Sequence, residues 1–409
     1  MSRTPRKASR DAVVATYELA GEFSLADNAR VVAMEQSTGT WTRVRKRTGS
    51  LEDRLAAWVV STDRRKGTAR IGFPSEIFEP ENVPGILSIV AGNLFGLGSL
   101  RKARLLDVEF PPSFLRRYPG PGFGIAGVRK AVGTQRSGRP HGGTIVKPKV
   151  GLPPRQTAER AAEAARGGID LVKDDETLTD QDFCPLDERA RLVLEALDKV
   201  RDETGKACLY AVNVTAGPQE IAERWDVVKS AGANCAMVDV LTAGYDALLE
   251  LRRACNVPIH VHRAMHGALT RSRDFGIDMK AVCRLVRMCG GDQLHVGSAA
   301  GKMEHPADLQ GLLDALKEPM GQLRPVLPVS SGGLHPALVP KEVKAFGSDV
   351  VLQAGGGIHG HPAGSTAGGR ALMQAIEATH AGKSLKSVRK PELQAALEAW
   401  GKETYQYAK

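Results

Sequence analysis

The stretch GTIVKPKVGLPPRQTAERAAEAARGGIDLVKDDE, residues 143–176, decides the fold. An apolar run at 144–149 is followed by an Ala-rich helical pattern at 155–166, two glycines and a second apolar run at 169–174. Glycine commonly follows the end of a helix, and short apolar runs of this kind suit buried strands. The stretch therefore predicts a strand–helix–strand unit.

The same unit recurs through the rest of the chain. Further strands are expected at 208–215, 235–241, 259–263, 293–297, 326–329 and 350–353, and further helices at 187–203, 219–230, 245–254, 279–288, 307–316 and 367–378. Eight strand–helix units in about 240 residues predict a (β/α)₈ TIM barrel. A doubly wound sheet is the alternative, but no GxGxxG motif opens the first strand–helix turn.

Residues 1–135 lack this rhythm and predict a separate α+β domain that precedes a barrel domain at 136–409. The first domain is expected to contain a helix at 24–36 and strands or alternating runs at 13–19, 41–45, 57–61 and 69–73. A Gly- and Pro-rich segment, 120–140, reads as the linker, and a last helix is expected at 391–405.

The composition of the 409 residues, 42% hydrophobic and 25% charged, is that of a globular protein and excludes disorder and fibres. A net charge of +10 suits anionic ligands, but only 5% of residues are aromatic, which argues against a nucleic-acid platform. The six cysteines form no CxxC pair and read as reduced thiols. The most apolar stretch, 86–98, is too short to span a membrane, and no signal peptide is apparent. We expect a cytoplasmic protein that binds neither nucleic acid nor membrane.

Function in such a barrel belongs to the carboxyl ends of the strands and the loops after them. Most of the expected strands end in polar or glycine-rich residues, namely 147–149, 173–176, 260–263, 295–297, 330–333 and 355–357. Each segment alone is compatible with a solvated turn or a structural histidine pair. Because chance would distribute such residues over both ends of the barrel, together they predict an active site at this end.

Lys173 and Asp175 lie two residues apart on an extended strand and so face the same side, and Glu176 can turn toward them. An ammonium group repels a metal cation, so these residues suit Mg²⁺ only if CO₂ converts Lys173 to N6-carboxylysine. Three oxygen ligands plus water then match the octahedral preference of Mg²⁺. The alternative is an ordinary Lys–Asp salt bridge.

Two anion sites are also expected. Backbone N–H groups of the glycine-rich ends of the last two strands can hold phosphate oxygens, and Arg263 with His295 and Ser331 can form a second site. Lys147, beside the expected metal, could act as a general base, and Lys302 lies in a loop of small residues that could close as a lid. Either lysine could instead be a solvated surface ammonium.

These motifs resemble those of the RuBisCO large-chain family. The barrel motifs are, in order, GTIVKPKVGL, GGIDLVKDDE, HVHRAMH, GGDQLHVGSAAGKME, LPVSSGGLHP and LQAGGGIHGHP. EQSTGTW at 35–41 and SIVAGNLFG at 88–96 resemble motifs of that family's N-terminal domain. The resemblance covers about residues 10–380 in the family's order, which makes the set specific although each tract is weak alone.

The resemblance implies a metal site of carbamylated Lys173, Asp175 and Glu176 that holds Mg²⁺. It implies catalytic roles for Lys147, Lys149, His262 and Lys302. It implies an antiparallel homodimer with shared active sites, to which the partner subunit would contribute Glu35, Thr40, Trp41 and Asn93. The remaining substrate-binding residues would be Arg263, His295, Ser331, Gly332, Gly333, Gln353, Gly355 and Gly356.

Some features depart from carboxylating members of the family. The segment from Lys302 to Ser331 is shorter, Gln293 replaces a frequent histidine, and residues 355–369 look like RuBisCO-like proteins of form IV. We therefore interpret the chain as a RuBisCO-like protein of form IV. We expect a Mg²⁺-dependent lyase of carbohydrate metabolism that forms an enediolate from a phosphorylated sugar or sugar acid, with decarboxylation of a 3-oxo sugar-acid phosphate as the first hypothesis. The alternatives are ribulose-1,5-bisphosphate carboxylase, a methionine-salvage type of ketose-phosphate enolase or isomerase, and a non-catalytic regulatory dimer.

Overall fold

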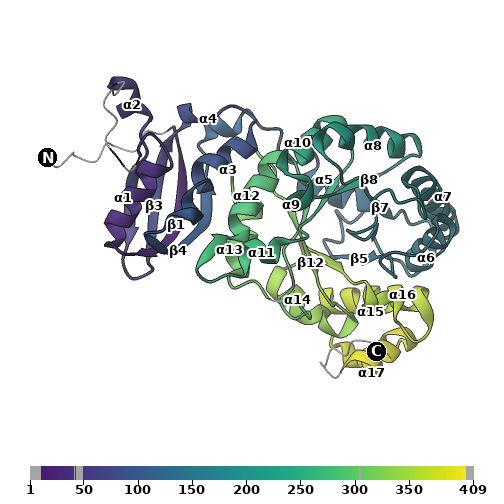
Figure 1. Ribbon diagram of the computed structural model, residues 1–409. Helices are drawn as coiled ribbons and strands as arrows, with labels where there is room; N and C mark the ends of the chain where they lie inside the picture. Colours follow the sequence, from purple (N-terminus) through teal and green to yellow (C-terminus); the bar gives the residue numbers. More distant parts are fainter. Residues whose placement is uncertain (1–10, 41, 43–48, 304, 402–409) are drawn as a thin grey trace. The chain divides into compact units, whose positions relative to one another are not determined.

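The computed structural model describes residues 11–40, 42, 49–303 and 305–401, which form two compact units (Figure 1). One unit contains the segment that ends at Gly120, together with Met265–Cys289 and Glu318–Leu323. The other contains Pro121–Ala264, Gly290–Lys317 and the segment that begins at Arg324. The first unit thus includes two segments from the second half of the chain, and the boundary expected after residue 135 falls inside the second unit.

The first unit is an α+β domain built on a five-stranded sheet in the order β10-β4-β1-β3-β2, in which only the β10–β4 pair is parallel. Its strands are β1 (Ala12–Gly21), β2 (Trp58–Asp63), β3 (Thr68–Pro74), β4 (Leu100–Glu109) and β10 (Phe275–Ile277). Its helices are α1 (Leu25–Glu35), α2 (Ser50–Leu55), α3 (Val83–Ala91), α4 (Pro112–Leu115), α11 (His266–Thr270) and α12 (Met279–Cys289). The run expected at 41–45 lies, apart from Thr42, outside the described residues.

The second unit is a closed barrel of eight parallel strands in the order β11-β12-β13-β5-β6-β7-β8-β9. These are β5 (His141–Ile145), β6 (Leu171–Lys173), β7 (Leu209–Asn213), β8 (Cys235–Asp239), β9 (Ile259–His262), β11 (Gln293–His295), β12 (Leu327–Ser331) and β13 (Val351–Gln353). Every one overlaps an expected strand, so the prediction of an N-terminal α+β domain followed by a TIM barrel is confirmed.

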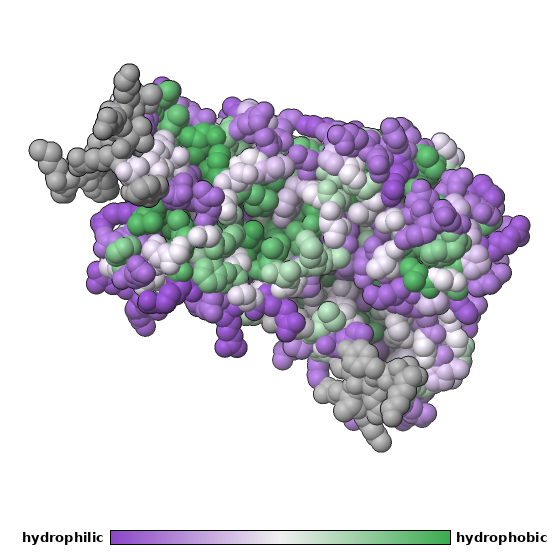
Figure 2. All heavy atoms as spheres, viewed as in Figure 1, coloured by the Kyte–Doolittle hydropathy of each residue, from purple (hydrophilic) through white to green (hydrophobic). Residues whose placement is uncertain are grey.

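Helices cover most of the outside of the barrel, and one of them, α5, lies at its amino-terminal end (Figure 1). They are α5 (Gly124–Val132), α6 (Pro154–Arg166), α7 (Leu186–Thr204), α8 (Pro218–Ser230), α9 (Val240–Ala243), α10 (Tyr245–Ala254), α13 (Leu309–Lys317), α14 (Val339–Phe346), α15 (Gly356–His359), α16 (Gly364–His380) and α17 (Pro391–Trp400). In α8, for example, Ile221, Trp225 and Val228 are buried, and the surface at this place in Figure 2 is mostly hydrophilic, although Val227 is exposed. Among the described residues, no helix is both long and apolar enough to cross a membrane.

The amino-terminal end of the barrel is closed by α5. Val128 of this helix packs into the barrel core with Leu171, Met237 and Val329. The buried carboxylate of Asp292 accepts hydrogen bonds from the backbone N–H groups at the start of α5, at 2.6 and 2.8 Å. With this end filled, the carboxyl ends of the strands are left for chemistry.

Candidate active site

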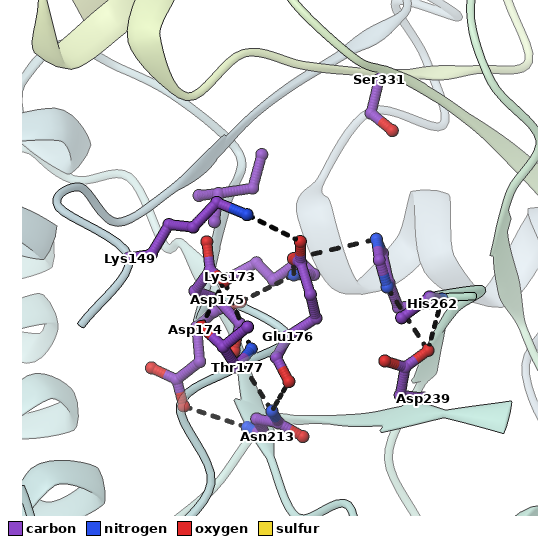
Figure 3. Close-up of polar contacts among 12 residues, drawn as sticks. Lys149, Lys173, Asp174, Asp175, Glu176, Thr177, Asn213, Asp239, His262 and Ser331 are labelled. Carbon is purple, nitrogen blue, oxygen red and sulfur yellow. Dashed lines mark hydrogen bonds and ion pairs between the residues drawn. The ribbon is translucent and has the colours of Figure 1, made fainter. Parts of the chain in front are cut away.

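Lys173 ends β6 and is fully buried, with the three acidic residues 174–176 directly after it. Its Nζ donates a hydrogen bond to the backbone oxygen of Asp174 at 2.7 Å and lies 3.3 Å from Glu176 Oε2. Figure 3 shows Lys173, Asp175 and Glu176 gathered at one place. The strand end thus presents one amine and two carboxylates within reach of one another.

Two further lysines reach this cluster from the segment after β5, which is the neighbouring strand. Lys147 Nζ lies 2.5 Å from Asp175 Oδ2, and Lys149 Nζ lies 3.6 Å from Glu176 Oε1. The hydrogen-bonded register pairs Ile145 of β5 with Lys173 of β6. Lys147 and Lys149, which follow Ile145 closely, therefore lie at the end of the barrel where Asp175 and Glu176 follow Lys173. The structure therefore brings together five of the residues that the sequence singled out.

His262, at the end of β9, faces the cluster from the other side (Figure 3). Its Nε2 lies 3.8 Å from Glu176 Oε2, and its Nδ1 lies 3.4 Å from Asp239 Oδ1. Asp239 ends β8 and also accepts a hydrogen bond from the backbone N–H of Ala264, at 2.7 Å. Sequence reasoning missed Asp239, although its position near the end of the strand expected at 235–241 was the signal for it.

Asp174, the first of the three acidic residues, is held by a buried ion pair and by hydrogen bonds. Asp174 accepts hydrogen bonds from Tyr210 Oη at 2.6 Å, from the backbone N–H of Asn213 at 3.0 Å and from Arg189 Nε at 3.2 Å. Arg189 is itself fully buried and donates to the backbone oxygens of Thr179 and Cys184, at 2.5 and 2.7 Å. Because these donors come from β7 and α7, they fix Asp174, and with it the backbone that carries Lys173 on one side and Asp175 on the other.

A second chain of polar side chains, buried except for Ser331, crosses the barrel interior from Gln293 to Ser331. His260 Nδ1 lies 2.6 Å from Gln293 Oε1, the two Nε2 atoms of His260 and His295 lie 2.7 Å apart, and His295 Nδ1 lies 2.7 Å from Ser331 Oγ. Burial lowers the pKa of His260 to about 3, and burial together with the charge of His262 holds the pKa of His295 well below its usual value. Both rings are therefore neutral at pH 7.

The glycine-rich strand ends lie against catalytic candidates. A Cβ atom on Gly355 would lie 2.9 Å from Lys147 Cε, and one on Gly333, whose φ is +88°, would lie 2.6 Å from Lys302 Cγ. Glycine at these two positions allows both lysine side chains to approach the backbone closely. Buried Gln353 donates to the backbone oxygen of Thr144 at 3.2 Å, while its Oε1 has no hydrogen-bond partner among the described residues. Gly332, with φ +112°, precedes Gly333, and Gly356 begins α15.

The remaining candidates belong to the first unit, apart from Arg263, which follows β9 and is buried. Asn93 Nδ2 donates to Glu35 Oε1 at 3.3 Å, so the structure brings these two distant motifs together. Thr40 is exposed, and Trp41 lies outside the described residues.

The donor set can be tested against Mg²⁺. Among the described residues, no three His, Cys, Asp or Glu side chains are grouped to hold a metal ion, so Asp175 and Glu176 need a third anionic ligand. Burial lowers the pKa of Lys173, which favours the neutral amine that reacts with CO₂. A carbamate on Lys173 would supply the missing anionic oxygen and remove the repelling ammonium group. With that modification, the residues fit Mg²⁺.

Comparison with known proteins places the chain in a family. The model of the ribulose bisphosphate carboxylase large chain, catalytic domain, matches residues 124–400, and that of the N-terminal domain matches residues 4–114. The ribulose bisphosphate carboxylase of Methanocaldococcus jannaschii is 42% identical over 397 residues, covering 91% of this chain and 93% of its own length. That of Archaeoglobus fulgidus is 39% identical over 425 residues, with 97% and 96% covered.

Solved structures give the same result. The octameric Rubisco from Pyrococcus horikoshii has a TM-score of 0.91 at 38% identity and covers 97% of this chain and 95% of its own. The dimeric archaeal Rubisco from Hyperthermus butylicus has a TM-score of 0.88 at 37% identity, with 97% of each chain covered. Because these relatives are named as carboxylases, they do not support the form IV interpretation. The chain belongs to the RuBisCO large-chain family.

Proposed function

We propose that this chain is a ribulose-1,5-bisphosphate carboxylase. The observation that carries the proposal is the gathering of Lys147, Lys173, Asp175 and Glu176 at the carboxyl end of the barrel, where RuBisCO chemistry requires a base and a metal site. Relatives at about 40% identity that bear the carboxylase name support the choice of reaction. This was the alternative, not the first hypothesis, of the sequence analysis.

The substrate's two phosphates would occupy the two anion sites. Arg263, with His295 and Ser331, would hold one phosphate, and the guanidinium would supply the positive charge because the buried histidine is neutral. Backbone N–H groups of Gly332, Gly333, Gly355 and Gly356 would hold the other, near Gln353. The Oε1 of Gln353, for which the described residues supply no hydrogen-bond partner, is a ready acceptor for a substrate hydroxyl group.

Carbamylated Lys173, Asp175 and Glu176 would hold Mg²⁺, which when bound would polarise the substrate carbonyl and stabilise negative charge beside it. Lys147 would remove the adjacent proton at its Nζ, with Lys149 close to the same carboxylate pair. His262, between Asp239 and Glu176, is suited to carry protons to and from the substrate hydroxyl groups. Lys302 would reach over from its loop and pair with the carboxylate that CO₂ forms.

The assembly that we propose is a homodimer with shared active sites. Glu35 and Asn93 already lie together in the first unit, and with Thr40 and Trp41 they would complete the site of the partner subunit. The solved relatives include a dimer and an octamer.

The decarboxylase hypothesis rested on the short segment between Lys302 and Ser331. Relatives that match about nine-tenths of this chain nevertheless bear the carboxylase name, and we give this more weight than the length of one segment. No contact in the described residues favours the decarboxylase, the enolase or the non-catalytic dimer, and none of them is proposed.

The test is incorporation of ¹⁴CO₂ with ribulose bisphosphate, after activation with bicarbonate and Mg²⁺. We expect labelled 3-phosphoglycerate from the wild-type chain, none from Lys173→Ala and wild-type yield from Lys199→Ala, which changes an exposed lysine of α7. A wild-type enzyme that fixes no label but releases CO₂ from a 3-oxo sugar-acid phosphate would overturn the proposal.

A further inference from the structure

Glu342 is a buried carboxylate, 1% exposed, in the first turn of α14. It accepts three hydrogen bonds: from the backbone N–H of Ala300 at 2.7 Å, from the backbone N–H of Ala299 at 3.1 Å and from Ser330 Oγ at 2.7 Å. The two backbone donors belong to the loop after β11, and the hydroxyl belongs to β12. One side chain thus joins a helix, a strand end and a loop.

That loop, Ser298–Met303, carries Lys302 and is called the lid loop below. Its first residue, Ser298, is buried and accepts a hydrogen bond from the N–H of Gly301 at 3.0 Å. At its far end, the N–H of Lys302 donates to the backbone oxygen of Gly332 at 2.7 Å. Glu342 therefore holds the base of the lid loop, two residues before the lysine.

The charge of Glu342 makes this attachment strong. No Lys, Arg or His side chain of the described chain forms an ion pair with it, so its negative charge is stabilised by the three donors and by the amino-terminal end of α14. Hydrogen bonds to an ionised acceptor are about twice as strong as neutral ones. If the base of the lid loop moved away, a buried carboxylate would lose two of its three donors, which is unfavourable.

We propose that Glu342 is a positioning residue that fixes the base of the lid loop, and thereby the reach of Lys302 toward the carboxylate formed from CO₂. The catalytic part of this statement rests on the proposed carboxylase function, whereas the attachment of the loop does not. Ser330 contributes by donating to the same carboxylate, while its neighbour Ser331 contacts His295 in the barrel interior.

The attachment can be tested without activity, by amide hydrogen exchange of the lid loop in the full-length protein. Because a hydrogen bond to a charged group contributes ~1.5–3 kcal/mol, Glu342→Gln should accelerate exchange at Ala299 and Ala300 about 10- to 100-fold. Ser330→Ala, which leaves the carboxylate in place, should cause a smaller acceleration at the same two amides. Lys344→Gln, an exposed change on the same helix, is the control and should leave exchange unchanged.

The catalytic consequence has its own readout. Glu342→Gln should lower the kcat of carboxylation about tenfold or more, while exchange of the substrate's α proton, which needs Lys147 but not the lid lysine, stays within about twofold of wild type. Unchanged amide exchange at residues 299 and 300 in a folded Glu342→Gln protein would overturn the attachment. An equal loss of proton exchange and carboxylation would overturn the positioning role, whereas a wild type without carboxylation would contradict only the proposed function.

Discussion

The buried pair of Arg189 and Asp174 allows a quantitative prediction. Both side chains are fully buried, and Arg189→Met would leave the Asp174 carboxylate with the Tyr210 hydroxyl and the Asn213 N–H but with no ion-pair partner in the described part of the chain. Removing one partner of a buried ion pair typically costs about 3–5 kcal/mol, which corresponds to at least about a hundredfold change in the unfolding equilibrium. We therefore expect a large loss of barrel stability.

The same helix provides a matched control. Arg191 pairs with Glu195 at 3.0 Å, but both side chains are about half exposed. Such a surface i,i+4 pair contributes about 0.3–0.5 kcal/mol, so Arg191→Met should scarcely alter stability. Urea unfolding followed by tryptophan fluorescence would compare the two variants, with the slope of each transition checked because the protein has two units.

A double variant separates buried charge from lost packing. Asp174→Asn removes the negative charge yet keeps an acceptor for Tyr210, so Asp174→Asn with Arg189→Met should regain much of the stability lost in Arg189→Met alone. If the free energies of unfolding of Arg189→Met and Arg191→Met differed by less than about 1 kcal/mol, the inference that Arg189 neutralises Asp174 would be refuted.

Three further predictions concern carbamylation, acid stability and assembly. Because burial lowers the pKa of Lys173, activation by CO₂ should approach its maximal rate at a lower pH than an exposed lysine would require. The assay is the half-time of activation measured as a function of pH. An activation rate that still rises steeply up to pH 10.5 would contradict this prediction. Burial lowers the pKa of His141 in the folded state to about 4, from an ordinary value of 6.5. As the pH falls, the unfolded state therefore binds the proton first, and the folded state loses stability between pH 6.5 and pH 4. At pH 5 the loss from this residue is about 2 kcal/mol. Unfolding curves at pH 5 and 7.5 should therefore differ less for His141→Gln than for wild type. Inactive Lys173→Ala and Asn93→Ala subunits should partly restore carboxylation when mixed, whereas no recovery after verified subunit exchange would place the whole site within one chain.

The barrel could be predicted because its strands are short apolar runs bounded by glycine or polar residues, a signal that is local in sequence. β4 was missed because Arg101, Lys102 and Arg104 interrupt its apolar pattern; in the folded domain, Lys102 pairs with Glu18 and Arg104 with Asp278. The addition of β10 to the same sheet joins residues more than 160 positions apart in sequence, as in the pairing of Phe275 with Ala103, and nothing local signals it.

The site was predictable to a similar extent. Residues at strand ends could be assigned to one end of the barrel, since parallel strands share an orientation. Residues that support the site from helices could not be assigned. A charged residue in an amphipathic helix, such as Arg189 or Glu342, is predicted to face solvent until the packing is known. The last helix, expected at 391–405, begins at Pro391 and ends at Trp400 in the described residues.

The two serines that end β12 bear on how this family can change in evolution and in engineering. Side chains of consecutive strand residues point to opposite faces, so Ser330 serves the outer face and Ser331 the interior. An insertion or deletion that shifted β12 by one position would exchange the two and disrupt both faces. Length changes between Lys302 and Leu327 leave that alternation intact as long as Leu327 keeps its pairing with Gln293 of β11, so the two faces of β12 place no limit on the length of this stretch.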